Sequence, residues 1–183
     1  LNTHAENHIN ISPIVQVISY NDVYGKYPQM MGWWSASIIN KNGVIISNDH
    51  VVDAGNGALA SAFSVCITKE ISKKPVCDYT ASLIERDDTM DISILKINPK
   101  DIYGNDVDYS QFKTIDIDYT YEPKNQDETI AIWYPWVWAD TISETKGIVS
   151  WVSEYNGYNY IKTDTLIAWG NSGGAFIRDG KLI

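Results

Sequence analysis

The chain has 183 residues, of which 44% are hydrophobic and 20% are charged, as is ordinary for a packed globular protein. Its 14 Lys and Arg residues against 23 Asp and Glu residues give a net charge of -9, which argues against a nucleic-acid partner. No apolar run is long enough to cross a bilayer, so we expect no membrane span in this chain.

Short strand-like runs separated by turns fill the first half of the chain. Residues 1–12 are polar and without pattern, so we expect a flexible lead-in. Residues 13–100 are expected to form an N-terminal β-barrel, with a loop at residues 20–31. Its strands are expected at residues 13–19, 32–39, 44–47, 59–68, 76–84 and 91–97.

The second half begins after a connector, residues 101–127, which is rich in Asn, Asp, Pro and Tyr and holds one short candidate strand at 114–118. Residues 128–183 are expected to form a C-terminal β-barrel. Its strands are expected at 128–133, 146–153, 158–163 and 175–177, with another beginning at Lys181. No periodicity of helical length occurs, so the predicted fold class is all-β.

Two cysteines, Cys66 and Cys77, flank a lysine-rich turn between two strand-like runs. A symmetric hairpin would place them opposite each other, but the apolar alternation points Cys66 outward and Cys77 inward. A β-bulge would remove this conflict. Two alternatives stay open: a disulfide in a secreted or cell-envelope protein, or two free thiols in a cytoplasmic one.

His4 and His8 have the i, i+4 spacing of a helical metal-binding pair. No carboxylate or cysteine nearby completes such a site, so we expect neither a metal nor another cofactor. A mobile N-terminus is the better explanation of the two residues.

The most informative stretch is Gly-Asn-Ser-Gly-Gly at residues 170–174, which places one hydroxyl, that of Ser172, among three glycines. Glycine lets the backbone turn tightly and lets a ligand approach the main chain. The N–H groups of such a loop can stabilise a developing negative charge. A serine at this place needs a base before it can act as a nucleophile.

Two residues at the borders of predicted strands can complete the chemistry. Serine hydrolysis needs a nucleophile, a base, and an acid that holds the base in the correct tautomer. Ser172, His50 and Asp91 could supply these roles; each is weak evidence alone, but together with the glycines they form a strong pattern. Asp87 and Asp88 are better explained as residues that cap a turn.

In four segments the chain resembles a chymotrypsin-fold serine protease, closest to the bacterial HtrA/Deg type. They are residues 43–52, 91–96, 145–150 and 161–175. The resemblance implies two six-stranded antiparallel β-barrels with the site between them, and polypeptide substrates. The last segment is highly specific, whereas the first two are specific only in combination.

The resemblance also assigns roles. His50, Asp91 and Ser172 would be the catalytic residues, and the main-chain N–H groups of Gly170 and Ser172 would form the oxyanion hole. Leu166 and Ile167, with Trp169 beside them, would belong to the substrate pocket. Their apolar character implies a small or medium apolar side chain at the cleavage site.

Three departures from the family pattern stand out. Residues 33–36, Trp-Trp-Ser-Ala, replace most of a glycine-rich run; bulky aromatic residues also stand in the loop at 134–140, which carries three, and at Trp169. The chain stops at Ile183, where the sixth strand of the second barrel would begin, so we expect that barrel to be incomplete and further domains or an oligomer to be possible. The alternatives to a serine endopeptidase are a catalytically silent binding or scaffolding protein on the same fold, and an esterase with the same triad.

Overall fold

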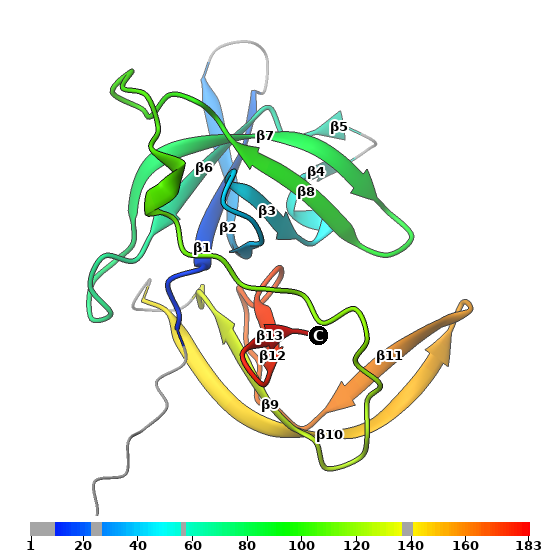
Figure 1. The fold of residues 1–183 in the computed structure, drawn as a ribbon. Helices are drawn as coiled ribbons and strands as arrows, with labels where there is room; N and C mark the ends of the chain where they lie inside the picture. Colours follow the sequence, from blue (N-terminus) through cyan, green and yellow to red (C-terminus); the bar gives the residue numbers. More distant parts are fainter. Residues whose placement is uncertain (1–9, 23–26, 56–57, 137–140) are drawn as a thin grey trace, which may run out of the picture.

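The structure, a computed structural model, describes residues 10–22, 27–55, 58–136 and 141–183. Two groups of antiparallel strands, one above the other in Figure 1, account for nearly all of its regular structure. In the described part of the chain the only helices are two single 3-10 turns, η1 (Asp49–Val51) and η2 (Tyr109–Gln111). The expected all-β, chymotrypsin-like fold is therefore confirmed.

The first group is a closed six-stranded barrel in the order β1-β2-β3-β8-β7-β6. Its strands are β1 (Ile14–Asp22), β2 (Pro28–Ile38), β3 (Val44–Ser47), β6 (Ala62–Ile67), β7 (Val76–Asp87) and β8 (Ile92–Ile97). Alternate residues fill its interior, so that Val15, Val17, Ile45, Val65 and Leu95 are fully buried. A small ribbon of β4 (Asp53–Gly55) and β5 (Ala58–Leu59) follows η1.

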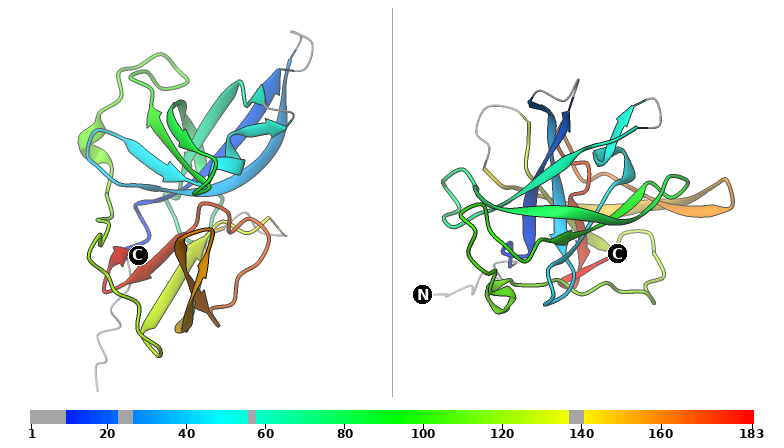
Figure 2. Two further views of the ribbon diagram at one scale, coloured as in Figure 1. Left: turned by 90° about the vertical axis from the view of Figure 1, so that its right-hand side faces the viewer. Right: turned by 90° about the horizontal axis from the view of Figure 1, so that it is seen from above.

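The second group is a curled five-stranded sheet in the order β11-β10-β9-β12-β13. Its strands are β9 (Glu128–Trp133), β10 (Ser143–Tyr155), β11 (Tyr158–Thr163), β12 (Ala175–Arg178) and β13 (Lys181–Leu182). Within the described residues β11 and β13 are its two edges, so this sheet is not closed into a barrel. The long β10–β11 hairpin projects beyond the rest of the molecule (Figures 1 and 2).

Two details of the strand prediction were wrong. Of the loop expected at residues 20–31, residues 20–22 and 28–31 are strand and residues 23–26 lie outside the described residues; Tyr20 pairs with Met30 and Asp22 with Pro28 at the polar, exposed end of the β1–β2 ribbon. Backbone pairing continues there without the apolar alternation on which the prediction rested. The candidate strand at 114–118 is instead an extended segment with one isolated bridge, between Ile117 and Leu182.

The connector is bonded to both halves of the molecule as it passes between them (Figure 2). Ile115 N–H donates to Ile38 O of the barrel at 3.0 Å, and Asp118 N–H donates to Leu182 O of the second sheet at 2.8 Å. Ile115 is also buried in the second apolar cluster, with Ile132 and Ile177. The connector therefore helps to fix the two halves relative to each other.

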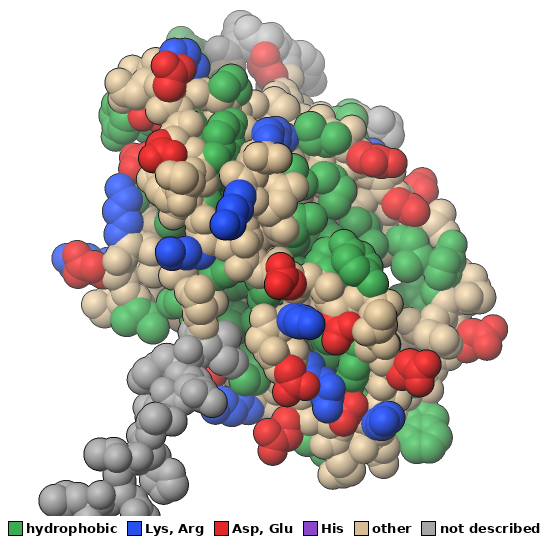
Figure 3. Space-filling view, viewed as in Figure 1, with side chains coloured by type: hydrophobic (Ala, Val, Ile, Leu, Met, Phe, Trp, Pro, Cys, Tyr) green, Lys and Arg blue, Asp and Glu red, His purple; other side chains and the backbone are tan. Residues whose placement is uncertain are grey.

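The surface has mixed charge. On the face drawn in Figure 3, Lys and Arg side chains are interspersed with carboxylates, and hydrophobic side chains gather between the barrel and the sheet. None of the helices in the described ranges is long and apolar enough to span a membrane.

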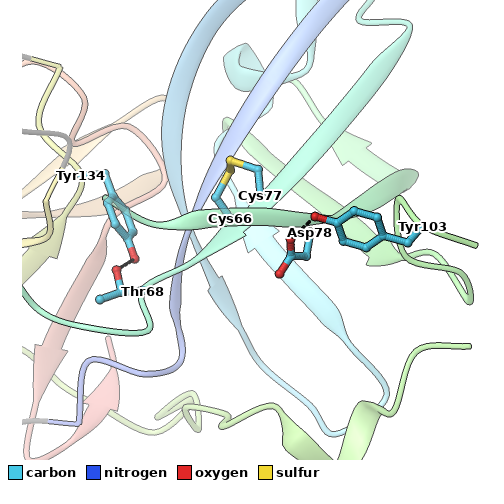
Figure 4. The surroundings of a disulfide bond; sticks show 6 residues. All are labelled: Cys66, Thr68, Cys77, Asp78, Tyr103 and Tyr134. Carbon is cyan, nitrogen blue, oxygen red and sulfur yellow. Dashed lines mark hydrogen bonds between the residues drawn. A yellow bond between two sulfur atoms is a disulfide. The ribbon is translucent and has the colours of Figure 1, made fainter. Parts of the chain in front are cut away.

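Cys66 and Cys77 form a disulfide between β6 and β7 (Figure 4). Val65 pairs with Tyr79 and Ile67 pairs with Val76, so two residues of β7 lie opposite the single residue Cys66. This is the β-bulge that the conflict in strand alternation required, and neither cysteine is a free thiol.

The disulfide-bonded hairpin is held from two sides (Figure 4). The hydroxyls of Thr68 and Tyr134 are hydrogen-bonded at 2.7 Å, which joins the hairpin to the segment after β9. On the other side Asp78 accepts a hydrogen bond from the Tyr103 hydroxyl of the connector at 3.4 Å. The hairpin thus contacts the second half of the chain as well as its own barrel.

We predict that the double variant Cys66→Ser, Cys77→Ser lowers the free energy of unfolding by about 3 kcal/mol, because the unfolded chain regains the freedom that the cross-link removes. Urea unfolding with and without a reductant measures the difference. The double variant should not respond to the reductant. Equal stability of wild type and variant under oxidising conditions would contradict the prediction.

Candidate active site

His50 and Asp91 come together because the strands that precede and follow them are paired. His50 lies in η1, just after β3, and Asp91 lies just before β8, while Ser47 of β3 pairs with Ser93 of β8. The Asp91 carboxylate accepts hydrogen bonds from His50 Nδ1–H at 2.9 Å and from the His50 main-chain N–H at 3.0 Å. This places the proton of a neutral imidazole on Nδ1 and leaves Nε2 as an acceptor.

Asp91 has a left-handed backbone conformation, with φ of 54°. Such a conformation costs a non-glycine residue about 1–2 kcal/mol, although Asp tolerates it better than most. Three hydrogen bonds fix it here: the two from His50, and one from Asn48 Nδ2 to Asp91 O at 2.9 Å. The side chains of His50 and Asp91 are 47% and 45% exposed, so the pair is open to solvent on one side.

A second carboxylate supports the 3-10 turn that carries His50. Asp49 is buried and accepts two hydrogen bonds from the Arg86 guanidinium of β7, at 2.7 and 2.5 Å. The hydrogen bond with Asp49 also raises the pKa of Arg86. Trp34 packs edge-on against the His50 ring, with ring centroids 5.8 Å apart. His50 is therefore held directly by Asp91 and by Trp34 of β2, and indirectly, through Asp49, by Arg86 of β7.

The serine loop requires glycine at two places. Gly170 and Gly173 have φ of 96° and 73°, in the region that L side chains rarely adopt. A Cβ on Gly170 would also collide with the backbone of residues 134–136, and one on Gly173 would collide with Ser35 O and Ser47 Oγ. Tight packing against both halves of the molecule thus explains these two glycines.

Asn48 joins the two parts of the site. Its Oδ1 accepts a hydrogen bond from Gly173 N–H at 2.6 Å, while its Nδ2 donates to Asp91 O at 2.9 Å. The residue before Gly173 is Ser172, and Asn48 is two positions before His50. One side chain therefore connects the serine loop to the His50–Asp91 pair.

Ser172 lies in this loop, but its hydroxyl has no hydrogen bond to His50 or to another described residue. Within the described ranges, the main-chain N–H groups of Gly170 and Ser172 also have no acceptor. In enzymes without bound substrate the hydrogen bond between nucleophile and base is often long, and it tightens when substrate binds.

The predicted pocket residues differ in their surroundings. Ile167 lines a cavity of about 190 Å³ that also touches Asn171 and Gly174, on either side of the serine. Its other lining side chains include Trp133, Ile161 and Phe176. Leu166 and Trp169 are 73% and 75% exposed and are not among the residues that line this cavity.

Trp169 instead ends a row of three aromatic rings. Trp33 and Trp136 contact edge to face with centroids 6.0 Å apart, and Trp136 and Trp169 do so at 6.3 Å. The neighbouring Tyr134 is fully buried, and this burial raises its pKa to about 12. Residues 137–140, which complete the aromatic loop, lie outside the described residues, as do His4 and His8.

Sequence reasoning missed Asn48 and Arg86 as supports of the site. Asn48 had a local signal, since it is a polar residue at the end of a buried strand, two positions before the histidine. Arg86 had none, because its partner Asp49 is distant in sequence and only barrel closure brings them together.

Comparison with known proteins shows the family of this chain. Residues 34–183 match the family described as trypsin-like peptidase domain. The chain is 30% identical over 167 residues to the periplasmic serine endoprotease DegP of Escherichia coli K12, covering 87% of this chain and 30% of DegP. It is 26% identical over 158 residues to human serine protease HTRA3, covering 81% of this chain and 31% of HTRA3.

A solved structure also matches. The serine endoprotease from Yersinia pestis superposes with a TM-score of 0.68 at 24% identity, covering 95% of this chain and 53% of the other. The chain thus belongs to the family of trypsin-like peptidase domains, and its similarity to HtrA/Deg proteins is confirmed. It spans less than a third of the length of DegP and HTRA3.

We predict that Asn48→Ala lowers the free energy of unfolding by about 1–3 kcal/mol, because Gly173 N–H and Asp91 O both lose a partner. Thermal or urea unfolding measures the change. Asn42→Ala is the matched control, since the Asn42 side chain is exposed and has no hydrogen bond within the described residues. Equal stabilities of the two variants would contradict the linking role of Asn48.

Proposed function

We propose that this protein is a serine endopeptidase in which Ser172 is the nucleophile, His50 the general base and Asp91 the acid that orients His50. The observation that supports it best is the double hydrogen bond from His50 to the Asp91 carboxylate, at 2.9 and 3.0 Å. It leaves Nε2 of the neutral ring available to accept a proton. Family membership supports the same assignment.

The reaction would proceed in two halves. As His50 Nε2 takes the Ser172 proton, Oγ bonds to the substrate carbonyl carbon; the protonated imidazole then gives its proton to the leaving amine as the peptide bond breaks. The same nitrogen then deprotonates a water that attacks the acyl-enzyme, and as the bond to Oγ breaks and the acid leaves, the imidazolium returns the proton to Ser172 Oγ. Activity must decline in acid, because a protonated imidazole cannot act as the base.

The oxyanion hole would be formed by the main-chain N–H groups of Gly170 and Ser172. Both lack an acceptor within the described residues, so they are free to bind the negative oxygen of the tetrahedral intermediate. Donors of this kind, fixed before the reaction, are worth several kcal/mol of transition-state stabilisation each.

A fluorophosphonate probe tests the assignment directly. We expect it to modify Ser172 of the wild type covalently, as read by mass spectrometry, and to leave Ser172→Ala unmodified.

Asp91→Asn should lower kcat by up to about 10⁴-fold, because an amide can stabilise the wrong tautomer of His50.

Ser172→Ala is also the control for peptide hydrolysis, because contaminating proteases would remain active in that preparation. A wild type that folds but neither reacts with the probe nor cleaves a denatured protein substrate would favour a silent binding or scaffolding protein. Cleavage of small esters without cleavage of peptides would favour an esterase.

We further propose that the cavity beside Ser172 binds the side chain that precedes the cleaved bond. Its lining includes Ile161, Ile167 and Phe176, and it holds no charged side chain. A cavity of about 190 Å³ with apolar walls would accept a small or medium apolar side chain.

A panel of quenched-fluorescence peptides that differ at this one position should show preference for Ala and Val over charged residues. Ile161→Ala should move the preference towards larger apolar side chains by roughly tenfold in kcat/KM, since each methylene group is worth that much or more. Tyr160→Ala is the control, because adjacent strand residues face opposite sides. Preference for Lys or Arg would refute the pocket assignment.

The disulfide suggests where the protein works. Disulfides persist in oxidising compartments and are rare in the cytosol. Together with the periplasmic location in the name of the Escherichia coli relative, the Cys66–Cys77 bond supports a cell-envelope or secreted protein.

A further inference from the structure

Ser35 is a fully buried serine of β2, and its hydroxyl lies between two segments of the second half of the chain. The hydroxyl donates a hydrogen bond to Gly170 O at 3.0 Å and accepts one from Tyr134 N–H at 2.8 Å. Both bonds are buried, so water does not compete for them.

The backbone of Ser35 adds a second attachment. Its N–H donates to Ser172 O at 2.8 Å, and its carbonyl accepts from Ser47 Oγ at 2.8 Å. A single residue of the first barrel therefore holds the serine loop at two carbonyls, those of Gly170 and Ser172.

These two carbonyls flank the peptide group that carries the Ser172 N–H. Each peptide is planar, so a bond to its oxygen fixes the orientation of the whole unit. The oxygen of that peptide group, Asn171 O, accepts a hydrogen bond from Gly174 N–H at 2.7 Å, and Ser35 holds the units before and after it, so the Ser172 N–H has little freedom to rotate.

The Gly170 N–H is fixed through the same hydroxyl by a longer route. The Gly170 N–H belongs to the peptide group between Trp169 and Gly170. The oxygen of this group, Trp169 O, accepts a hydrogen bond from Trp136 N–H at 2.9 Å. In a trans peptide the N–H points away from the C=O, so this bond also directs the Gly170 N–H. Residue 136 belongs to the segment that begins at Tyr134, whose N–H is bonded to the Ser35 hydroxyl.

We propose that the Ser35 hydroxyl is a positioning group for the two oxyanion-binding amides, an inference that rests on the proposed function. Glycine at position 170 gives the loop a backbone that can rotate easily, and the hydroxyl bond restrains it. Without that bond, Gly170 O and Tyr134 N–H would be buried without a partner and the loop would shift to satisfy them.

Ser35→Ala tests the proposal, with activity expressed per active site titrated by the fluorophosphonate probe. We expect kcat to fall by about 10- to 1000-fold, as when an oxyanion donor is lost, while KM stays within about twofold. Affinity for a peptidyl trifluoromethyl ketone, whose adduct carries the oxyanion, should fall by a similar factor. The acid limb of the pH–rate profile should not move, because His50 and Asp91 are untouched.

Ser37→Ala is the matched control. Ser37 is a buried serine two residues further along β2, on the same side of the strand, and it has no hydrogen bond to the serine loop in the described structure. It should keep full kcat per titrated site. If Ser35→Ala does not fold, Ser35→Cys keeps the size of the side chain with a weaker donor, and its kcat should still fall at least about threefold.

The outcomes separate the two proposals. A wild type without labelling or turnover would defeat the proposed function itself. An active wild type with unchanged kcat in the Ser35 variants would defeat only the role of Ser35. A lower kcat with unchanged affinity for the trifluoromethyl ketone would also defeat it, because the loss would then lie outside the oxyanion hole.

Discussion

The hydrogen bonds that join the serine loop to the first barrel are the constraint on which the rest of the site depends. Gly173 N–H is bonded to Asn48, and the carbonyls of Ser172 and Gly170 are bonded to Ser35. Ser172 and His50 belong to different halves of the chain, so no local structure could align them. The bonds lie across the junction between those halves, where a buried polar group without a partner would be costly.

The closed barrel provides the rigid side of this junction. β3 and β8 are paired, so the residues after one and before the other meet at the same edge, and Asp91 can accept two hydrogen bonds from His50. The left-handed backbone of Asp91 is tolerated because those bonds, with one from Asn48, fix it. The strand framework and the polar contacts at its edge thus act together.

The bulky residues that depart from the family pattern pack around the loop. Trp33, Trp136 and Trp169 form a row of edge-to-face contacts, and Trp34 packs against His50. Aromatic contacts of this kind add about 0.5–1.5 kcal/mol each to the burial of their surface. The row joins β2 to the segment that contains Trp136 and to Trp169, which precedes Gly170, so these residues contribute to the same junction as Ser35.

Strand alternation, turn signals and the Gly-Asn-Ser-Gly-Gly motif are local properties of the chain, so the fold class and the candidate residues could be predicted before the structure was known. The sequence also identified the need for a bulge if Cys66 and Cys77 were to pair. Three features became visible only in the folded molecule: the two cysteines do pair, strand pairing reaches Asp22 and Pro28, and Ser35 contacts the serine loop. Ser35 and Gly170 are 135 residues apart in the chain. Their contact depends on how two separately formed sheets pack, which no periodicity in either segment encodes.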